Sequence, residues 1–158
     1  MLNMNKISQV AIVVKDIEKA MKLYWDGLGI GPWKIWDMCP PLTTEITYRG
    51  KSVFHKYVAA ETMVGDLNFE LLMHQEGDTV YKDFLDENGE GLHHIAYETN
   101  DIDAALEKFK KMGIGVIQSG KVAKDSYYYL DTYSMFGVMI ELYTGHGFRP
   151  PDRMYPPE

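Results

Sequence analysis

The stretch "GEGLHHIAYETNDID", residues 89 to 103, carries the strongest architectural signal in the chain, because an altered copy of it occurs earlier. The earlier copy is "KISQVAIVVKDIE", residues 6 to 18. The two copies overlay without a gap when Gln9 is placed on His94, an offset of 94 − 9 = 85 residues. In both, an apolar strand-like run reaches Asp-Ile and continues into a helical pattern. The sequence therefore predicts two related modules.

Each module is expected to consist of one strand, one helix and three further strands. The two predicted helices, "DIEKAMKLYWDGLGI" and "DIDAALEKFKKMGIG", have apolar residues at helical spacing and begin at the candidate N-caps Asp16 and Asp101. The further strands are predicted at "EITYRG", "SVFHKYVAA" and "LNFELLM", and at "GVIQSG", "SYYYLDT" and "GVMIELYT". This pattern indicates an α+β fold of two tandem βαβββ modules.

The length of 158 residues and the 46% of hydrophobic residues are typical of one domain with a sizeable core. We expect a single domain over residues 1–146, with module one at about 6–74, a linking helix at about 77–89 and module two at about 91–144. The proline-rich residues 147–158 are predicted to form an extended tail. That tail would pack on the body or on a partner subunit through Phe148 and Tyr155.

The net charge of −7 and the lack of a long Lys/Arg cluster argue against nucleic-acid or anionic-membrane partners. The single cysteine, Cys39, excludes an internal disulfide framework and any multi-cysteine metal site. The N-terminal stretch lacks the pattern of a signal peptide, and no window has the 18 or more apolar residues of a membrane span. We therefore expect a cytoplasmic protein.

These features resemble the vicinal oxygen chelate superfamily, which includes glyoxalases, methylmalonyl-CoA epimerases, extradiol dioxygenases and bleomycin-resistance proteins. The resemblance rests on the two modules, on "GLHHIAYETNDIDAALEKFKKMG" and on the strand-borne pairs Glu70-Leu71 and Glu141-Leu142, and it extends from about Ile7 to Tyr143. Within the superfamily, "GEGLHHIAYETNDIDAAL" preceded by "DFLDENG" is most similar to the methylmalonyl-CoA epimerases. The resemblance implies a curved sheet that forms a cup, and a homodimer.

The resemblance also implies a metal site in the cup, with ligands from the first and last strand of each module. Those places are held here by Gln9, Glu70, His94 and Glu141. Strand side chains alternate between faces, so His93 is expected to point away from the cup. Two carboxylates, an amide and an imidazole suit Co²⁺, Mn²⁺, Ni²⁺ or Mg²⁺.

Gln9 stands where the epimerases and glyoxalases usually have a histidine. This difference leaves open either weaker metal binding or no metal in the isolated protein. The residue types by themselves also allow a structure without a metal site. Glu70 and Glu141 would then lie on a solvated strand face, and His94 would be a core histidine.

The implied activity is that of an isomerase, an epimerase or racemase that removes and returns a proton at the carbon α to a carbonyl, assisted by a divalent metal. Aligning "SVFHKYVAA" with the third strand of the epimerase module places His55 at an acid/base position. An imidazole suits this role because it titrates near neutral pH. Glu141 would supply the second acid/base group. His55 could instead be a half-exposed strand residue, since a slip of one position reverses the face.

Aromatic side chains are expected to bind the small carbonyl substrate; the candidates are Trp33, Trp36, Tyr57, Tyr127 and Tyr129. The two tryptophans could instead cover the core end of the first helix. An aromatic wall without a basic cluster for a CoA phosphate suits an aromatic carbonyl substrate, such as an isoflavanone of the dihydrodaidzein type. Two further functions stay open: a non-catalytic binder of the bleomycin-resistance kind and a lyase of the glyoxalase type.

Overall fold

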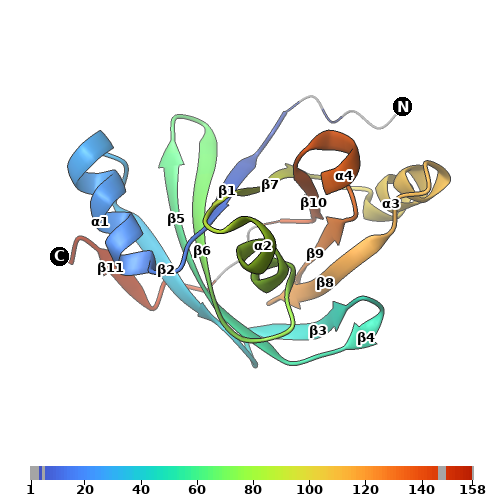
Figure 1. Ribbon diagram of the computed structural model, residues 1–158, viewed down its shortest axis with the longest axis horizontal. Coiled ribbons are helices and arrows are strands. Elements are labelled where there is room, and N and C mark those ends of the chain that lie inside the picture. Colours follow the sequence, from blue (N-terminus) through green and yellow to red (C-terminus); the bar gives the residue numbers. More distant parts are fainter. Residues whose placement is uncertain (1–3, 5, 146–148, 158) are drawn as a thin grey trace.

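The computed structural model describes residue 4, residues 6–145 and residues 149–157, which form a curled sheet with helices on its outer side and at one end (Figure 1). The elements in chain order are β1 (Gln9–Val13), α1 (Ile17–Leu28), β2 (Trp33–Met38), β3 (Thr43–Tyr48), β4 (Lys51–Ser52), β5 (His55–Val64), β6 (Leu67–Gly77), α2 (Val80–Asn88), β7 (Gly91–Glu98), α3 (Ile102–Lys111), β8 (Val116–Val122), β9 (Asp125–Leu130), α4 (Tyr133–Phe136), β10 (Met139–Tyr143) and β11 (Arg153–Tyr155). The strand order across the sheet is β11-β2-β5-β6-β1-β7-β10-β9-β8-β3-β4.

The repeat predicted from the sequence is present at the centre of the sheet. Strands β1 and β7 pair antiparallel with each other, and each is followed by a helix. The carboxylates of Asp16 and Asp101 accept hydrogen bonds from the backbone N–H of Lys19 at 3.0 Å and of Ala104 at 3.1 Å, so both predicted N-caps are confirmed. Helix α1 ends at Gly29, whose φ of 67° is a left-handed conformation that suits glycine.

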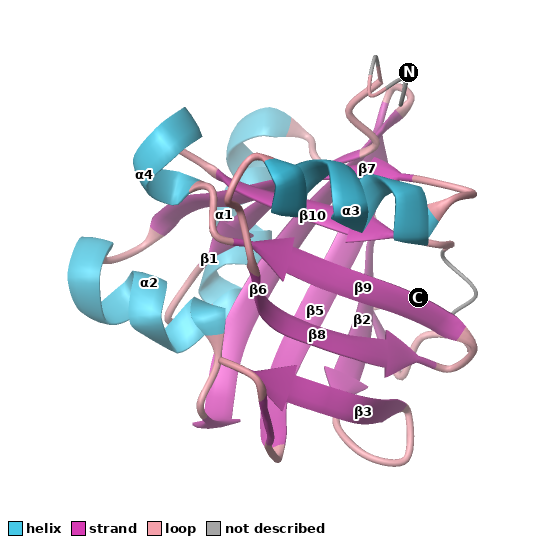
Figure 2. Ribbon diagram, turned by 90° about the vertical axis from the view of Figure 1, so that its right-hand side faces the viewer, coloured by secondary structure: helices cyan, strands magenta, loops and turns pink. Residues whose placement is uncertain are grey.

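Three apolar clusters hold the layers together. Helix α1 packs Ile17 and Met21 on one half of the outer sheet face, and α3 packs Ala105 and Phe109 on the other half (Figures 1 and 2). The third cluster fills the concave side, where α2 contributes Val80, Tyr81 and Phe84. Helix α2, the predicted linking helix, therefore closes one end of the cup.

The strands of the first module differ from the prediction. Its second strand is β2, over "WKIWDM", whereas "EITYRG" lies mainly in β3, which pairs with β8 of the second module. The stretch Cys39–Leu42, with Pro40 and Pro41, interrupts the chain after β2, and β3 then joins the edge of β8 instead of the edge of its own module. The two modules are therefore linked through their strands at a second place.

The C-terminal tail also contains a strand. Arg153 to Tyr155 form β11, which pairs antiparallel with β2, and Tyr155 packs against the cluster under α1. The other predicted tail anchor, Phe148, lies outside the described residues. Among the residues that the structure describes, no helix is both long and apolar enough to cross a membrane.

Candidate functional site

The four predicted ligand residues meet on the concave side of the sheet. They lie on four adjacent strands, Glu70 on β6, Gln9 on β1, His94 on β7 and Glu141 on β10. His94 is the centre of the group: its Nε2 lies 3.0 Å from Glu141 Oε2, 3.3 Å from Gln9 Oε1 and 3.6 Å from Glu70 Oε2. All four side chains are buried, so a solvated strand face for the two glutamates is wrong.

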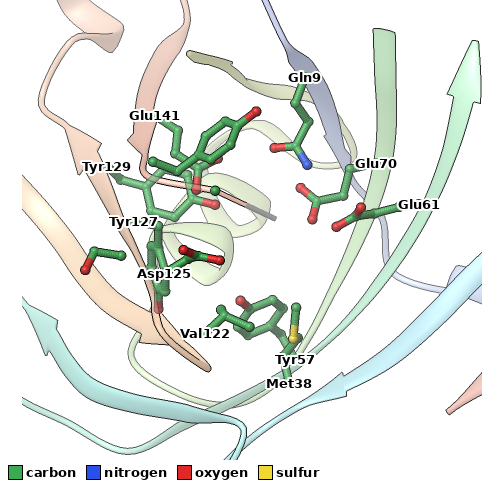
Figure 3. A pocket seen from close by; sticks show the side chains of 13 residues that line it. Gln9, Met38, Tyr57, Glu61, Glu70, Val122, Asp125, Tyr127, Tyr129 and Glu141 are labelled. Atoms are coloured by element: carbon green, nitrogen blue, oxygen red, sulfur yellow. The ribbon is translucent and has the colours of Figure 1, made fainter. Parts of the chain in front are cut away.

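Three of these residues, Gln9, Glu70 and Glu141, line a small cavity with a volume of about 40 Å³ (Figure 3). Glu61 and Glu70 lie on one side of it, and Glu141 and Tyr129 lie on the other. The described residues that line it are Gln9, Met38, Tyr57, Glu61, Glu70, Val122, Asp125, Ser126, Tyr127, Tyr129, Glu141, Tyr143 and Gly145. Three of the predicted substrate-binding residues, Tyr57, Tyr127 and Tyr129, are thus at the cavity.

The cavity concentrates carboxylates. Four of its described lining residues are Asp or Glu, and none is Lys, Arg or His. Burial raises the pKa of Glu61 to about 7, against the opposing hydrogen bond from Asn68. Burial, with the nearby Glu61 and Glu141 carboxylates, raises the pKa of Glu70 well above its usual value. At neutral pH the cavity therefore needs either protons on these groups or a bound cation.

The imidazole of His94 is neutral at physiological pH, because complete burial lowers its pKa to about 3. Its Nδ1 lies 2.9 Å from Nδ1 of His93, so one of the two atoms donates a hydrogen bond to the other. The neutral imidazole is the form that binds metal ions.

The sequence profile of the Glyoxalase/Bleomycin resistance protein/Dioxygenase superfamily matches residues 8–129. The chain belongs to this superfamily. The mitochondrial methylmalonyl-CoA epimerase of Mus musculus is 30% identical over 112 residues, which are 70% of this chain and 55% of that protein. The chain thus spans about half the length of this curated relative.

Solved structures of other proteins share the fold. The hypothetical protein BH1468 from Bacillus halodurans C-125 has a TM-score of 0.68 and 22% identity, covering 91% of this chain and 96% of that one. Methylmalonyl-CoA epimerase from Mycobacterium tuberculosis has a TM-score of 0.64 and 19% identity, with coverages of 92% and 93%. A methylmalonyl-CoA epimerase in complex with methylmalonyl-CoA and NH4+ has a TM-score of 0.62 and 21% identity, with coverages of 94% and 100%. These similarities confirm the vicinal oxygen chelate fold expected from the sequence.

The donor set of the four side chains Gln9, Glu70, His94 and Glu141 fits a divalent cation in its chemistry. No three His, Cys, Asp or Glu side chains among the described residues form a ready-made metal centre by themselves. The group around His94, however, combines an imidazole nitrogen with three oxygen-bearing side chains, and these three line a cavity that has no Lys, Arg or His among its described lining residues. Nitrogen and oxygen donors of this kind suit Mg²⁺, Mn²⁺, Co²⁺ or Ni²⁺.

The prediction that His93 faces away from the cup is wrong. The register between β1 and β7 shifts between Ala11 and Ile12, so that Ala11 pairs with His94 and Ile12 pairs with Leu92. His93 is the extra residue of this β-bulge, and a bulge interrupts the alternation of faces. Its ring is completely buried and contacts the rings of His94 and Tyr129. Both histidines of the pair therefore belong to the concave side.

The structure does not bring His55 to the cavity. Its ring is completely buried at the start of β5, next to Tyr57, and it is not one of the cavity-lining residues. Burial, with the nearby His74, lowers the pKa of His55 to about 4. Neither ring nitrogen has a hydrogen-bond partner among the described residues. A half-exposed position for His55 is wrong as well, since the residue is part of the interior.

The two tryptophans point to different sides of β2. Trp33 packs under α1 with Tyr24 and Phe69, so it covers the core end of the helix and does not reach the cup. Trp36 lies on the concave side and donates a hydrogen bond from Nε1 to the carbonyl oxygen of Arg149 at 2.9 Å. Positions three apart in a strand lie on opposite faces, so two tryptophans at this spacing could not both face the cup.

A second, larger cavity of about 680 Å³ adjoins the first, and Glu61 and Tyr143 line both. Trp36 lines this outer cavity with the tail residues Arg149, Pro150 and Pro151. Lys6 and Lys34 also line it, so the structure brings together three basic side chains, with Arg149, that do not form a cluster in the sequence. The tail thus forms part of the wall of a candidate binding site.

Glu61 is the site residue that sequence reasoning missed. It lies within the apolar run "YVAAETMV" of β5, four positions after Tyr57 and therefore on the same face of the strand. A charged residue inside an apolar strand was also the signal that identified Glu70 and Glu141. Applied to β5, this criterion would have found Glu61.

Proposed function

We propose that the protein is an epimerase or racemase that removes and returns a proton at the carbon α to a carbonyl. The observation that carries this proposal is the group of buried glutamates, Glu61, Glu70 and Glu141, around one small cavity. Carboxyl groups can both accept and donate a proton, and burial raises the pKa of Glu61 to about 7, near the operating pH. The similarity to a methylmalonyl-CoA epimerase supports the same reaction class.

In the proposed reaction, the carboxylate of Glu141 takes the α-proton. The electron pair of the broken C–H bond moves onto the carbonyl oxygen and forms an enolate. Tyr57, Tyr127 and Tyr129 remain protonated, because burial raises the pKa of each hydroxyl. Their hydroxyl groups are available to donate hydrogen bonds to the enolate oxygen.

A divalent metal is part of the proposal. Gln9, Glu70, His94 and Glu141 would hold it, and when bound it would polarise the carbonyl as a Lewis acid, an effect worth several kcal/mol. The amide of Gln9 is a weaker donor to late transition metals than an imidazole. We therefore propose weaker metal binding than in a site with a histidine at this position.

The proposed substrate is a methylmalonyl-CoA-type thioester or an isoflavanone of the dihydrodaidzein type. A cavity of about 40 Å³ has room for only the reacting end of such a molecule. The adjoining cavity of about 680 Å³ is within the size range of ligand sites and would hold the remainder. Trp36 in that wall suits a flat ring, and Lys6 and Lys34 suit an anionic group.

The test is solvent exchange at the α-carbon. The purified protein is incubated in D₂O with methylmalonyl-CoA or dihydrodaidzein, with no added metal and with Co²⁺, Mn²⁺, Ni²⁺ or Mg²⁺ in turn. We expect deuterium to enter the α-position of at least one compound, together with loss of optical activity. If neither compound exchanges its α-hydrogen under any of these metal conditions, the proposal is contradicted.

The second candidate is a non-catalytic binder of an aromatic molecule, which the tyrosines around the cavity favour. A binder would form a stoichiometric complex with dihydrodaidzein, seen as quenched tryptophan fluorescence, and would leave the α-hydrogen unexchanged. A lyase of the glyoxalase type would instead consume a glutathione hemithioacetal, which the same preparation can be assayed against.

A further inference from the structure

One wall of the outer cavity is built by the C-terminal tail together with β2. The tail lies beyond residues 8–129, the part of the chain that matches the superfamily profile. The wall combines one indole, three proline rings and two basic side chains, and its members are Pro32, Lys34, Trp36, Arg149, Pro150 and Pro151. Apolar ring surfaces of this kind suit a flat ring of a ligand.

The tail is fixed to β2 by several specific contacts. Strand β11 pairs antiparallel with β2, and the backbone N–H of Asp152 donates to a carbonyl oxygen of β2 at 2.8 Å (Figure 1). Arg153 donates two hydrogen bonds to the carboxylate of Asp37, at 2.7 Å and 3.2 Å. The indole Nε1 of Trp36 donates to the carbonyl oxygen of Arg149 at 2.9 Å. Because the wall is already in place, a ligand can bind to it without the cost of ordering the tail.

The two cavities together contain more acidic than basic side chains. Among the described residues, the basic ones that line either cavity are Lys6, Lys34 and Arg149. The acidic ones are Glu61, Asp66, Glu70, Glu98, Asp125 and Glu141. Three positive and six negative formal charges give −3, and a bound divalent metal ion would bring the balance to −1. The guanidinium of Arg149 is moreover paired with Asp152, with 2.6 Å between Nη1 and Oδ1.

This balance discriminates between the two substrate classes of the proposed function. An acyl-CoA carries phosphate groups, and methylmalonyl-CoA adds a carboxylate next to the reacting carbon. Each of these groups would add negative charge to a site that already has an excess of it, and like charges repel more strongly away from bulk water. A hydroxyl group, in contrast, donates to a carboxylate and accepts from an ammonium or guanidinium group, so the mixed lining of the outer cavity suits it.

We propose that the outer cavity selects a ring that carries hydroxyl groups and no charged group, and that the tail is the segment that determines this specificity. The inference rests on the proposed function and narrows its substrate to a hydroxylated ring ketone. The reacting end of the molecule lies in the inner cavity, and its remote ring lies against Trp36, Pro150 and Pro151. The hydroxyl group on that ring contacts the charged side chains of the outer cavity.

The first experiment compares three compounds on the wild-type protein. Exchange of the α-proton in D₂O is measured over a range of concentrations of dihydrodaidzein, of isoflavanone without ring hydroxyl groups, and of methylmalonyl-CoA. We expect dihydrodaidzein to have the highest kcat/KM, with a KM about tenfold or more below that of isoflavanone, because hydrogen bonds to charged groups are the strong ones. Free coenzyme A in excess should not inhibit the exchange of dihydrodaidzein.

The second experiment changes the tail. Arg149→Gln removes a charged group from the wall, and Arg153→Gln removes the two hydrogen bonds to Asp37. Each should raise the KM of dihydrodaidzein by about tenfold and leave kcat within about twofold, because contacts remote from the reacting carbon act equally on substrate and transition state. The KM of isoflavanone should not change in Arg149→Gln. Lys110→Gln is the matched control: it removes an exposed cation of α3, paired with Glu107, and should leave both constants unchanged.

The third experiment changes the charge of the outer cavity. Asp66→Lys combined with Glu98→Lys replaces two acidic lining residues by basic ones, so the formal balance of the two cavities becomes positive. Free coenzyme A should then inhibit the exchange of dihydrodaidzein. Failure to inhibit would contradict the argument from charge.

Circular dichroism and thermal unfolding establish that each variant is folded; if Arg153→Gln is not, Arg149→Gln and Arg149→Lys test the wall. A higher kcat/KM for methylmalonyl-CoA than for dihydrodaidzein in wild type would overturn the proposed selectivity and leave the proposed function intact. An unchanged KM in both tail variants, or an equal loss of kcat for dihydrodaidzein and isoflavanone, would overturn the role of the tail. A wild-type protein that exchanges none of the three compounds would overturn the proposed function, and dissociation constants from tryptophan fluorescence would then test the tail by itself.

Discussion

His93 and His94 are consecutive in the chain, yet both rings face the interior, with their Nδ1 atoms 2.9 Å apart. The bulge in β7 allows this arrangement. Nε2 of the neutral His94 ring donates to the amide oxygen of Gln9, so its Nδ1 accepts from Nδ1 of His93; a metal ion bound at Nε2 would reverse this and make His93 the acceptor. His93 would then set the tautomer of His94, as the partners of metal-binding histidines commonly do.

Replacing His93 tests this relationship. His93→Phe removes the acceptor, so the affinity of the protein for Co²⁺ should fall by about 10–100-fold. His93→Asn can place Oδ1 near the former Nδ1 and should restore most of the affinity. Isothermal titration with Co²⁺ measures both. Equal affinities of wild type and His93→Phe would show that His93 has only a packing role.

His55 should be dispensable for proton exchange. Burial lowers its pKa from 6.5 to about 4, so the neutral ring contributes stability above about pH 6.5 that is lost as the pH falls through about 4. His55→Phe removes two unpartnered buried nitrogens and should unfold at a lower pH than wild type. Acid titration by circular dichroism checks this shift. Loss of α-proton exchange in a folded His55→Phe protein would restore the acid/base role for His55.

Gly120 makes room for a cavity tyrosine. A methyl group on Gly120 would lie 2.6 Å from Oη of Tyr127, its cross-strand neighbour. Gly120→Ala should therefore displace the ring of Tyr127, destabilise the fold by about 1–3 kcal/mol and slow exchange. Gly115→Ala is the matched control, since its methyl group meets no atom within 4 Å. Urea unfolding and the exchange assay distinguish the two; similar behaviour of both variants would contradict the prediction.

Gln9→His should strengthen the binding of Co²⁺ and Ni²⁺ by about tenfold or more, because imidazole is the better donor to these ions. Gln9→Ala should weaken it, since the amide oxygen lies 3.3 Å from His94 Nε2. Titration of the three proteins with Co²⁺ gives the order of affinities. An unchanged affinity in both variants would place the metal elsewhere.

The stability of the protein should depend on pH through Glu61. Its pKa rises from 4.5 in the unfolded chain to about 7 in the fold, so folding favours the protonated form. That stabilisation is present below about pH 4.5 and is lost as the pH rises through about 7. When the pH is raised from 5 to 8, the free energy of unfolding of Glu61→Gln should therefore increase relative to that of wild type by about 1 kcal/mol or more. Urea unfolding at both pH values measures the free energies; an equal difference at each would contradict the pKa shift.

The features that the sequence predicted well are those that repeat locally. The overlay of Gln9 on His94 predicted the positions of β1, β7 and the helices that follow them. Both signals used, an N-cap aspartate and a helical spacing of apolar residues, lie within about a dozen residues of sequence. The glutamates Glu70 and Glu141 stood out for the same reason, as charges within apolar strands. Their convergence with His94 then followed from the adjacency of the strands that carry them.

The features that escaped prediction depend on pairing between distant strands. Strand β3 pairs with β8, which brings Thr47 to Ser119, 72 residues later in the chain. A local sequence pattern cannot predict such a pairing. The inward turn of His93 depends on a register shift against β1. A strict alternation of faces gives the wrong orientation wherever such a shift occurs.

The two edge strands of the sheet, β11 and β4, limit how copies of this protein could associate. An open sheet edge is a template for strand addition, and short strands bordered by proline make poor templates. Here β11 covers β2 with three residues between Pro150-Pro151 and Pro156-Pro157, and β4 ends the opposite side with two residues. The expected homodimer would then form through the faces of the molecule and not through a shared sheet. Truncation after Gly145 would uncover β2, and the protein should then aggregate by edge-to-edge pairing.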